Sequence, residues 1–149
     1  MSQKNGVSKP DVALLVGTRK GAFVLSSDSK RKKWDLSEVH CRGGDVYHFV
    51  QDRRNGGTVY AAVNYMVWGA EVHISEDLGC TWRTAESPPK FENRDGKTLN
   101  KIWHIAPGRT SEPGVLYAGA DPASLFRSND GGENWEEIRS VADHPTNKH

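Results

Sequence analysis

One eight-residue stretch occurs twice: Ser75-Glu76-Asp77-Leu78-Gly79-Cys80-Thr81-Trp82 and, 53 residues later, Ser128-Asn129-Asp130-Gly131-Gly132-Glu133-Asn134-Trp135. Both copies read Ser-x-Asp-x-Gly-x-(Thr or Asn)-Trp. A short strand-like run precedes each copy, Glu71–Ile74 and Ser124–Arg127. A motif that returns at this distance is typical of a repeated structural unit with several β-strands. We therefore expect a repeat protein.

The shared positions of the motif suit a tight turn between two strands. Its glycine can take a positive φ at little cost, where the chain must reverse. Its aspartate and serine can accept hydrogen bonds from backbone N–H groups of the same turn, and its tryptophan can cover the turn with an apolar face. A single carboxylate per turn is too few ligands for calcium. We therefore assign a structural role to Ser75, Asp77, Gly79, Thr81, Trp82, Ser128, Asp130, Gly132 and Trp135.

Composition argues against several classes of protein. The 20 basic and 19 acidic residues almost cancel, so neither a nucleic acid nor a membrane is expected as a partner. The longest apolar stretch, Val12–Val16, is far too short to span a bilayer, and no secretory signal is visible in residues 1–11. Cys41 and Cys80 lack the spacing of zinc or redox sites. We expect a cytoplasmic protein without a metal or cofactor.

Short β-branched or aromatic runs bounded by Gly, Pro, Asn or Asp occur along the whole chain, and no window has a helical period. They predict strands in three groups. The first group has no counterpart of Val46–Val50 or Ile102–Ala106, so it has one strand fewer. Its turn has Ser29 and Arg31 at the Asp and Gly positions of the motif, which predicts a different closure. The expected strands are 12–17, 21–26, 33–36, 46–50, 58–63, 71–74, 81–84, 102–106, 115–119, 124–127 and 134–138.

These features resemble the BNR or Asp-box repeat of sialidase-like β-propellers. The runs Val12–Phe23 and Gly119–Trp135 look like bacterial BNR-repeat proteins labelled glycosyl hydrolase or exo-sialidase-like, which are related to sortilin-type and xyloglucanase-type propellers. The resemblance covers about residues 12–138. It implies an all-β fold, a partial β-propeller of four-stranded antiparallel blades, about 2.75 blades in number.

The expected blades are a partial one at residues 12–36 and two full ones at residues 46–84 and 101–138. A disordered tail, residues 1–11, and a polar tail, residues 139–149, would flank them. Since propellers have about four to eight blades, we expect the N-terminal portion of a longer protein. A natural truncation and a subunit that completes a ring by self-association are the alternatives.

The resemblance places ligands at the mouth of a central channel, on loops at one end of the strands. The ligand-binding candidates are Arg19, Tyr65, Trp68 and Asp121: the aromatic rings could stack on a sugar, and Arg19 could bind a carboxylate. Asp45 and Asp121 are the catalytic candidates. A glycosidase of the usual kind needs two carboxyl groups across the scissile bond, and neither aspartate has an identifiable partner. For each candidate taken singly, a solvated loop residue is the favoured alternative.

His48 and His104 occupy the same strand position, after Tyr47 and Trp103 respectively. They could be channel ligands or could pack between blades. We favour packing, because two histidines without a third ligand make no metal site.

Two functions remain open. One is carbohydrate binding, as part of a propeller related to sialidase-like glycosyl hydrolases, with this chain inactive alone. The other is a non-catalytic propeller scaffold for protein–protein interaction or assembly. The expected partners are a carbohydrate or protein ligand, with self-association through exposed blade edges.

Overall fold

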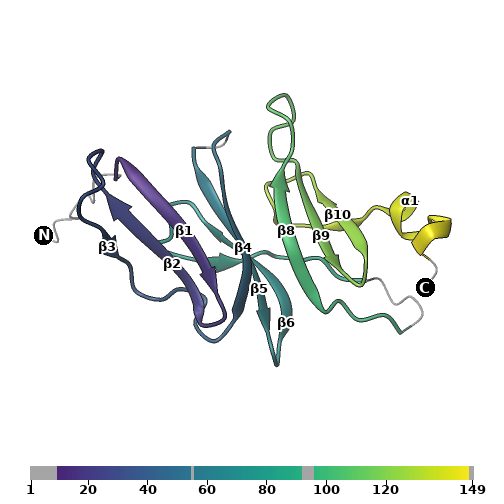
Figure 1. Cartoon of the computed structure of the whole chain (residues 1–149). Coiled ribbons are helices and arrows are strands. Elements are labelled where there is room, and N and C mark those ends of the chain that lie inside the picture. The colour runs from purple at the N-terminus through teal and green to yellow at the C-terminus, as the bar shows by residue number, and fades with distance from the viewer. Residues whose placement is uncertain (1–9, 55, 92–95, 148–149) are drawn as a thin grey trace, which may run out of the picture.

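The computed structural model describes residues 10–54, 56–91 and 96–147, and it contains three antiparallel β-sheets. The sheets stand side by side along the molecule, with the second sheet in the middle (Figure 1). The first sheet has three strands, and the other two have four each. The expected all-β fold of antiparallel units is confirmed.

Within each sheet the strands pair in chain order. The first sheet consists of β1 (Val12–Thr18), β2 (Gly21–Ser27) and β3 (Asp35–Leu36). The second consists of β4 (Asp45–Asp52), β5 (Thr58–Tyr65), β6 (Gly69–Ser75) and β7 (Arg83–Thr84). The third consists of β8 (Lys101–Pro107), β9 (Leu116–Asp121), β10 (Ser124–Ser128) and β11 (Glu136–Glu137).

Both described ends of the chain make contacts with other residues. Residues 1–9 of the expected N-terminal tail lie outside the described residues, but the Asp11 carboxylate accepts a hydrogen bond of 3.0 Å from the Ser29 N–H. After β11 come a short helix, α1 (Arg139–Ala142), which contacts β10, and a 3-10 turn (Pro145–Asn147). No helix in the described part of the chain has the length and apolar character needed to cross a membrane.

The sheets pack face to face, and each junction has its own apolar cluster. β4 packs between β1 and β8, and β8 also contacts β5. The junction of the second and third sheets buries Tyr60, Ala62, Val72, Ile74, Ala85, Ile102, Ile105, Leu116, Ala118, Ala120, Phe126 and Trp135. The junction of the first and second sheets is smaller and buries Ala22, Val46, Ala61 and Val63.

Each copy of the repeated motif closes a turn through its aspartate. In the first turn (residues 75–82), Asp77 accepts hydrogen bonds from the Thr81 N–H at 2.8 Å and the Thr81 hydroxyl at 2.6 Å. Ser75 Oγ accepts a bond of 2.8 Å from the Gly79 N–H, and Gly79 has φ +90°. Trp82 is half-buried, and its indole N–H donates to the Gly79 carbonyl at 2.9 Å.

The second turn (residues 128–135) repeats this arrangement. Asp130 accepts from the Asn134 N–H at 3.0 Å and from the Asn134 side-chain amide at 2.8 Å. The Gly132 N–H donates to Ser128 Oγ at 2.9 Å. Trp135 is only 6% exposed and donates to the Gly132 carbonyl at 2.8 Å. The residues before β7 and β11 are thus used for turn closure, which explains why these strands are shorter than expected.

The turn of the first sheet closes differently, as its degenerate sequence predicts. Asp28 Oδ1 accepts hydrogen bonds of 3.0 Å from the N–H groups of Lys30 and Arg31. Arg31 takes φ +55°, the left-handed conformation that glycine has in the repeated turns.

Candidate functional site

A β-bulge interrupts β4 and β8 at equivalent places. In β4 the register passes from Val46 to His48, so Tyr47 is the extra residue. In β8 it passes from Ile102 to His104, and Trp103 is the extra residue. A bulge redirects a side chain out of the regular alternation and is common beside functional sites. The chain thus presents two aromatic rings from matched irregularities in neighbouring strands.

The two bulged rings and a lysine form one cluster. The Tyr47 and Trp103 rings meet edge to face, with centroids 5.0 Å apart. The Lys101 ammonium lies 5.3 Å from the Tyr47 centroid and 4.9 Å from that of Trp103. Trp103 is 49% exposed, so this cluster offers a ring to solvent beside a positive charge.

An arginine and an aspartate lie beside this cluster. The Tyr47 hydroxyl donates to Asp45 Oδ2 at 3.4 Å, and Arg19 Nε lies 3.9 Å from the same oxygen. The Arg19 side chain is 92% exposed, so the ion pair adds little stability and leaves the guanidinium open to a ligand. The structure therefore brings together two sequence candidates, Arg19 and Asp45, and adds Tyr47, Lys101 and Trp103. We name these five residues the bulge cluster.

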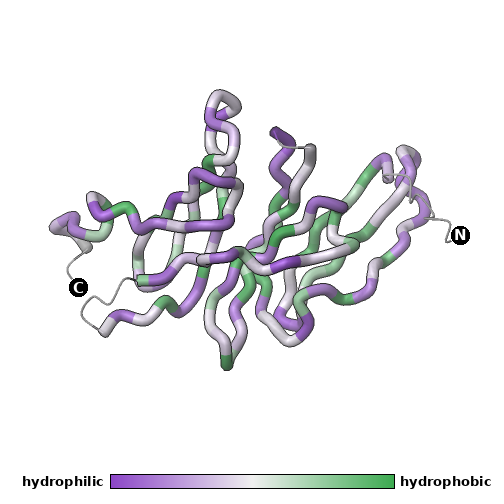
Figure 2. The backbone as a smooth tube through the Cα atoms, turned by 180° about the vertical axis from the view of Figure 1, so that it is seen from behind, coloured by the Kyte–Doolittle hydropathy of each residue, from purple (hydrophilic) through white to green (hydrophobic). Residues whose placement is uncertain are grey.

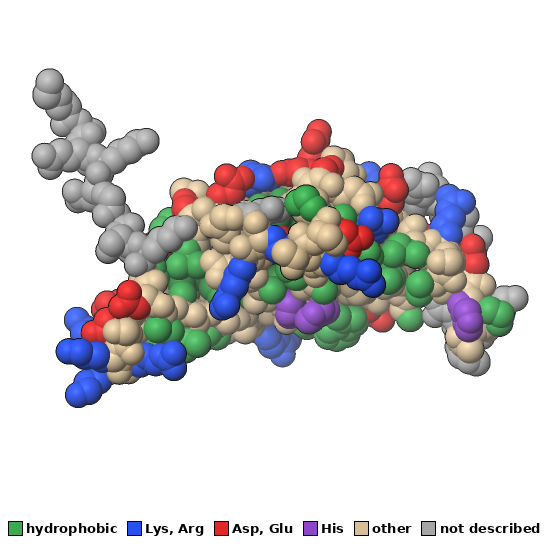
Figure 3. Space-filling view, turned by 90° about the horizontal axis from the view of Figure 1, so that it is seen from above, with side chains coloured by type: hydrophobic (Ala, Val, Ile, Leu, Met, Phe, Trp, Pro, Cys, Tyr) green, Lys and Arg blue, Asp and Glu red, His purple; other side chains and the backbone are tan. Residues whose placement is uncertain are grey.

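The two histidines that follow the bulges stack on each other. The His48 and His104 ring centroids are 3.8 Å apart, and the Ile105 N–H donates to His48 Nδ1 at 3.2 Å. Burial, together with the neighbouring His104, lowers the pKa of His48. His48 therefore packs as a neutral ring between β4 and β8, as favoured from the sequence. Figure 3 shows histidine side chains gathered near the middle of the molecule, next to hydrophobic ones.

Asp121 ends β9 opposite Lys101, and Asn100 holds it in place. Its carboxylate accepts from the Asn100 side-chain amide at 2.9 Å, and its carbonyl accepts from the Asn100 N–H at 2.8 Å. Asp45 begins β4 and has different partners. No hydrogen bond or ion pair between described residues joins the two aspartates.

The other two ligand candidates lie on or next to the β5–β6 turn. Tyr65 is half-buried, and its ring lies 5.8 Å from that of His73. Burial raises the pKa of Tyr65 to about 12, so its phenol stays protonated. Trp68 is 73% exposed, next to the exposed Met66 and Val67. In the described part of the chain, neither aromatic residue bonds to Arg19 or Asp121.

Metal binding has no obvious location. Within residues 10–54, 56–91 and 96–147, no three His, Cys, Asp or Glu side chains gather in a way that could hold an ion. The bulge cluster contains one carboxylate and two cations, so its chemistry favours hydrogen bonding and ring stacking.

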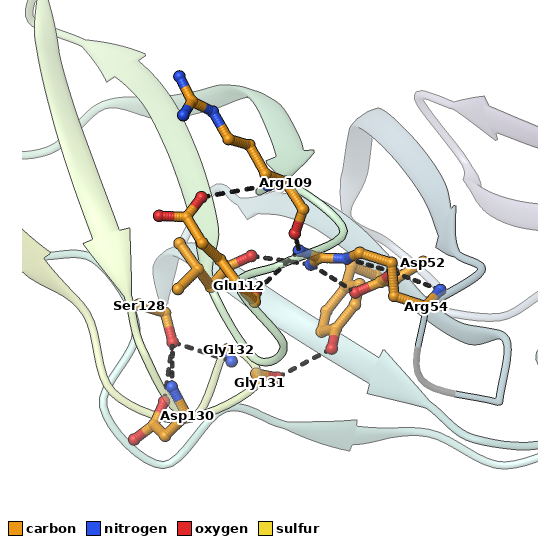
Figure 4. A network of polar contacts seen from close by, with 10 residues as sticks. Asp52, Arg54, Arg109, Glu112, Ser128, Asp130, Gly131 and Gly132 are labelled. Atoms are coloured by element: carbon orange, nitrogen blue, oxygen red, sulfur yellow. Dashed lines mark hydrogen bonds and ion pairs between the residues drawn. The ribbon is translucent and has the colours of Figure 1, made fainter.

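A further polar network lies elsewhere among the described residues, and the sequence did not predict it. Arg54, in the β4–β5 loop, forms a two-bond pair with Asp52, through Nε at 2.9 Å and Nη2 at 2.8 Å. Its guanidinium also donates to the carbonyls of Arg109, Glu112 and Val115 at 2.8–3.0 Å (Figure 4). Those carbonyls belong to the β8–β9 loop, so Arg54 ties the second sheet to the third.

This network is structural, because its charged pair is almost fully buried and each partner is bonded to the other. Asp52 is 1% exposed, and the Arg54 side chain is 12% exposed. The hydrogen bonds from Arg54 lower the pKa of Asp52 in spite of its burial. The same contacts raise the pKa of Arg54, which stays charged.

Comparison with known proteins supports the fold. No family model and no curated protein matches the chain. Among solved structures, it is similar to the GH74 xyloglucanase from Xanthomonas campestris, with a TM-score of 0.60 and 21% sequence identity. The match covers 88% of this chain and 19% of that enzyme, so the chain spans about a fifth of its length.

At this identity the likeness concerns the fold alone. Three face-packed antiparallel sheets and a propeller neighbour together make the chain a partial β-propeller.

Proposed function

We propose that this chain is part of a BNR or Asp-box propeller related to sialidase-like glycosyl hydrolases, and that it binds a carbohydrate at the bulge cluster. The proposal rests on the exposed Trp103 ring, which packs against Tyr47 and lies beside the Lys101 ammonium. The C–H face of a sugar stacks on such a ring, and nearby charged groups orient its hydroxyls. Asp45 and Arg19 supply a carboxylate and a second cation there.

The direct test is calorimetric titration with two probes. A xyloglucan oligosaccharide is one, because an enzyme of similar fold is a xyloglucanase. Sialyllactose is the other, because its carboxylate would pair with Arg19 or Lys101. We expect Trp103→Ala to weaken binding of the preferred sugar about tenfold, or about 1.4 kcal/mol. The exposed Leu36→Ala, in the first sheet, is the control and should leave the affinity unchanged.

The remaining sequence candidates define how far this surface extends. Trp68→Ala and Asp121→Asn should weaken binding if the sugar reaches the β5–β6 turn and the end of β9. Tyr65 is better tested by Tyr65→Phe, which keeps the buried ring and removes only the hydroxyl. If Trp103→Ala leaves the affinity unchanged and Trp68→Ala abolishes binding, the site lies at the β5–β6 turn.

Hydrolysis by the isolated chain is not expected. Glycosidases hold two carboxyl groups about 5–10 Å apart across the sugar, and Asp45 and Asp121 are each bonded to other groups. Turnover of fluorogenic sialosides or glucosides that disappears with Asp45→Asn or Asp121→Asn would refute this expectation.

A second function, a scaffold that associates with itself or with another protein, is favoured by one observation. Leu14 pairs with Leu25, Val16 with Phe23, and Leu25 with Leu36, so all five share one face of the first sheet. Leu14, Val16 and Leu36 are 48%, 37% and 64% exposed. Figure 2 shows hydrophobic stretches along the strands of this sheet. A contiguous apolar sheet face of this kind marks an interaction surface.

A further inference from the structure

A groove lies between the first sheet and the first repeated turn. It has a volume of about 700 Å³ and is lined by Pro10, Val24, Ser26, Ser37, Glu38, His40, Glu76, Asp77, Leu78, Gly79 and Cys80. We propose that this groove binds an extended peptide segment with an apolar side chain next to a basic one. This site is separate from the bulge cluster and does not depend on carbohydrate binding.

The chain contains an internal precedent at the equivalent place one junction later. After β7, the Ala85 N–H donates to the Val72 carbonyl at 2.8 Å, and the chain then runs onto the second repeated turn. There the Ser87 N–H donates to the Glu133 carbonyl at 2.8 Å, and Ser87 forms a parallel bridge with Asn134. An extended segment thus already docks on one copy of this turn.

At the first turn no described segment fills the corresponding place. The chain begins in the same way, because the Ser37 N–H donates to the Val24 carbonyl at 2.9 Å. It then stays with β2: His40 and Ala22 exchange two backbone hydrogen bonds of 2.8 and 2.9 Å. The carbonyl of Cys80, the counterpart of Glu133, accepts no hydrogen bond from any described residue. A guest strand could therefore donate an N–H there.

Side-chain differences make room for the guest. Ser26 stands where the second sheet has Ile74, which is 1% exposed and fills the matching junction. The groove floor includes the apolar Val24, Leu78 and Pro10. These surfaces suit one medium-sized apolar side chain of an extended segment.

The charge of the groove favours a basic residue next to the apolar residue of the bound peptide. Glu38 and Glu76 are exposed at the groove, and none of the described residues that line it is a lysine or an arginine. Burial lowers the pKa of His40 in spite of Glu38 and Asp77, so the imidazole is neutral near pH 7. Among the described residues, Glu76 has one long, exposed contact of 3.5 Å with Arg83, which a guest cation can replace. The groove is therefore negative, and a lysine or arginine complements it.

The test uses two capped peptides made from Glu86–Pro89 of the internal precedent, because Ser37 already fills the place of Ala85. The basic peptide carries Glu86→Lys and Ser87→Leu, and the matched acidic peptide carries only Ser87→Leu. Affinity is followed by amide chemical shifts of the whole protein. We expect the basic peptide to shift Gly79, Cys80 and Glu38 and to bind roughly tenfold more tightly than the acidic one.

Protein variants locate the contact. Glu38→Lys, at an exposed position, should weaken the basic peptide about tenfold, whereas Glu136→Lys on β11 should not. Ser26→Ile fills the groove as Ile74 does and should block both peptides. Equal affinity for the two peptides, shifts away from the groove, equal effects of the two charge variants, or no binding at millimolar concentrations would each overturn the proposal.

A chemical readout checks the same contact. Burial, and then the nearby Glu71, raises the pKa of Cys41 to about 12, so that thiol is protonated near pH 8. Cys80 is exposed and lines the groove, so alkylation reports on Cys80. The basic peptide should slow the alkylation of Cys80 severalfold. An unchanged rate at saturating peptide would contradict binding in the groove.

Discussion

At the scale of single residues, the fold rests on a few carboxylates that accept hydrogen bonds from their own neighbourhood. Burial alone would raise the pKa of Asp130, but hydrogen bonds from Asn134, Ser128 and Glu133 outweigh it and lower the pKa. The pKa of Asp77 is lowered in the same way, with burial opposed by bonds from Thr81, Ser75 and Cys80. The folded chain is therefore most stable when the Asp77 and Asp130 carboxyl groups are ionised.

Removing the Asp130 carboxylate should therefore destabilise the chain. Asp130→Ala leaves the Asn134 N–H and the Ser128 hydroxyl without their acceptor. We expect the free energy of unfolding to fall by on the order of 1–2 kcal/mol, measured by urea denaturation. Glu136→Ala, at an exposed residue on β11, is the control. A variant as stable as the wild type would show that the turn closes without this side chain.

Stability should also fall in acid. Asp52, Asp77 and Asp130 all have pKa values lowered on folding, so each binds protons less tightly in the folded than in the unfolded chain. Their stabilisation is complete above the ordinary aspartate pKa of about 3.9 and is lost as pH falls through the folded values. Unfolding free energies measured from pH 7 to pH 2 should decline mainly below about pH 4. Asp52→Asn should flatten the decline, and an equally steep curve would contradict the assignment.

At the scale of elements, the sequence is informative wherever structure depends on local chemistry. Glycine and aspartate at fixed places in each turn identify the hairpins, and the β-branched runs between them predict the strands. The bulges at Tyr47 and Trp103 could not be predicted, because a bulge is defined by register against the partner strand. The repeated pattern of an aromatic residue followed by histidine marks the two places, but the pattern alone does not indicate a bulge.

The Arg54 link could not be predicted for a related reason. Its acceptors in the β8–β9 loop are backbone carbonyls, which every residue type provides. Only Asp52, two residues earlier, carries a sequence signal. Local pairs can be read from a sequence, but contacts between loops 55 or more residues apart depend on how the sheets pack.

Arg54→Lys tests whether this link holds the two sheets together. Lysine keeps the charge but loses the fork that reaches Asp52 and the carbonyls at once. Partial loss of a buried pair should cost about 3 kcal/mol, read from the denaturation midpoint. The exposed neighbour Arg53→Lys is the matched control and should change little. Equal denaturation midpoints for the two variants would show that Arg54 does not hold the two sheets together.

At the scale of the whole molecule, the exposed apolar face of the first sheet should drive self-association. Sedimentation velocity across a concentration series is expected to show a shift toward larger species. Leu14→Lys with Leu36→Lys should reduce this shift, since both residues are exposed and their replacement spares the core. A wild-type chain that remains monomeric at every concentration would argue against this surface.

The most direct test of carbohydrate binding uses the five tryptophans as reporters. Their indole N–H resonances can be followed during titration with the oligosaccharide that binds more tightly. We expect a saturable shift of the Trp103 signal, accompanied by shifts of the Tyr47 and Lys101 amides. The indoles of Trp82 and Trp135, which donate to turn carbonyls, should not move. A saturable titration that leaves Trp103 unchanged, or no saturation with either sugar, would contradict carbohydrate binding at the bulge cluster.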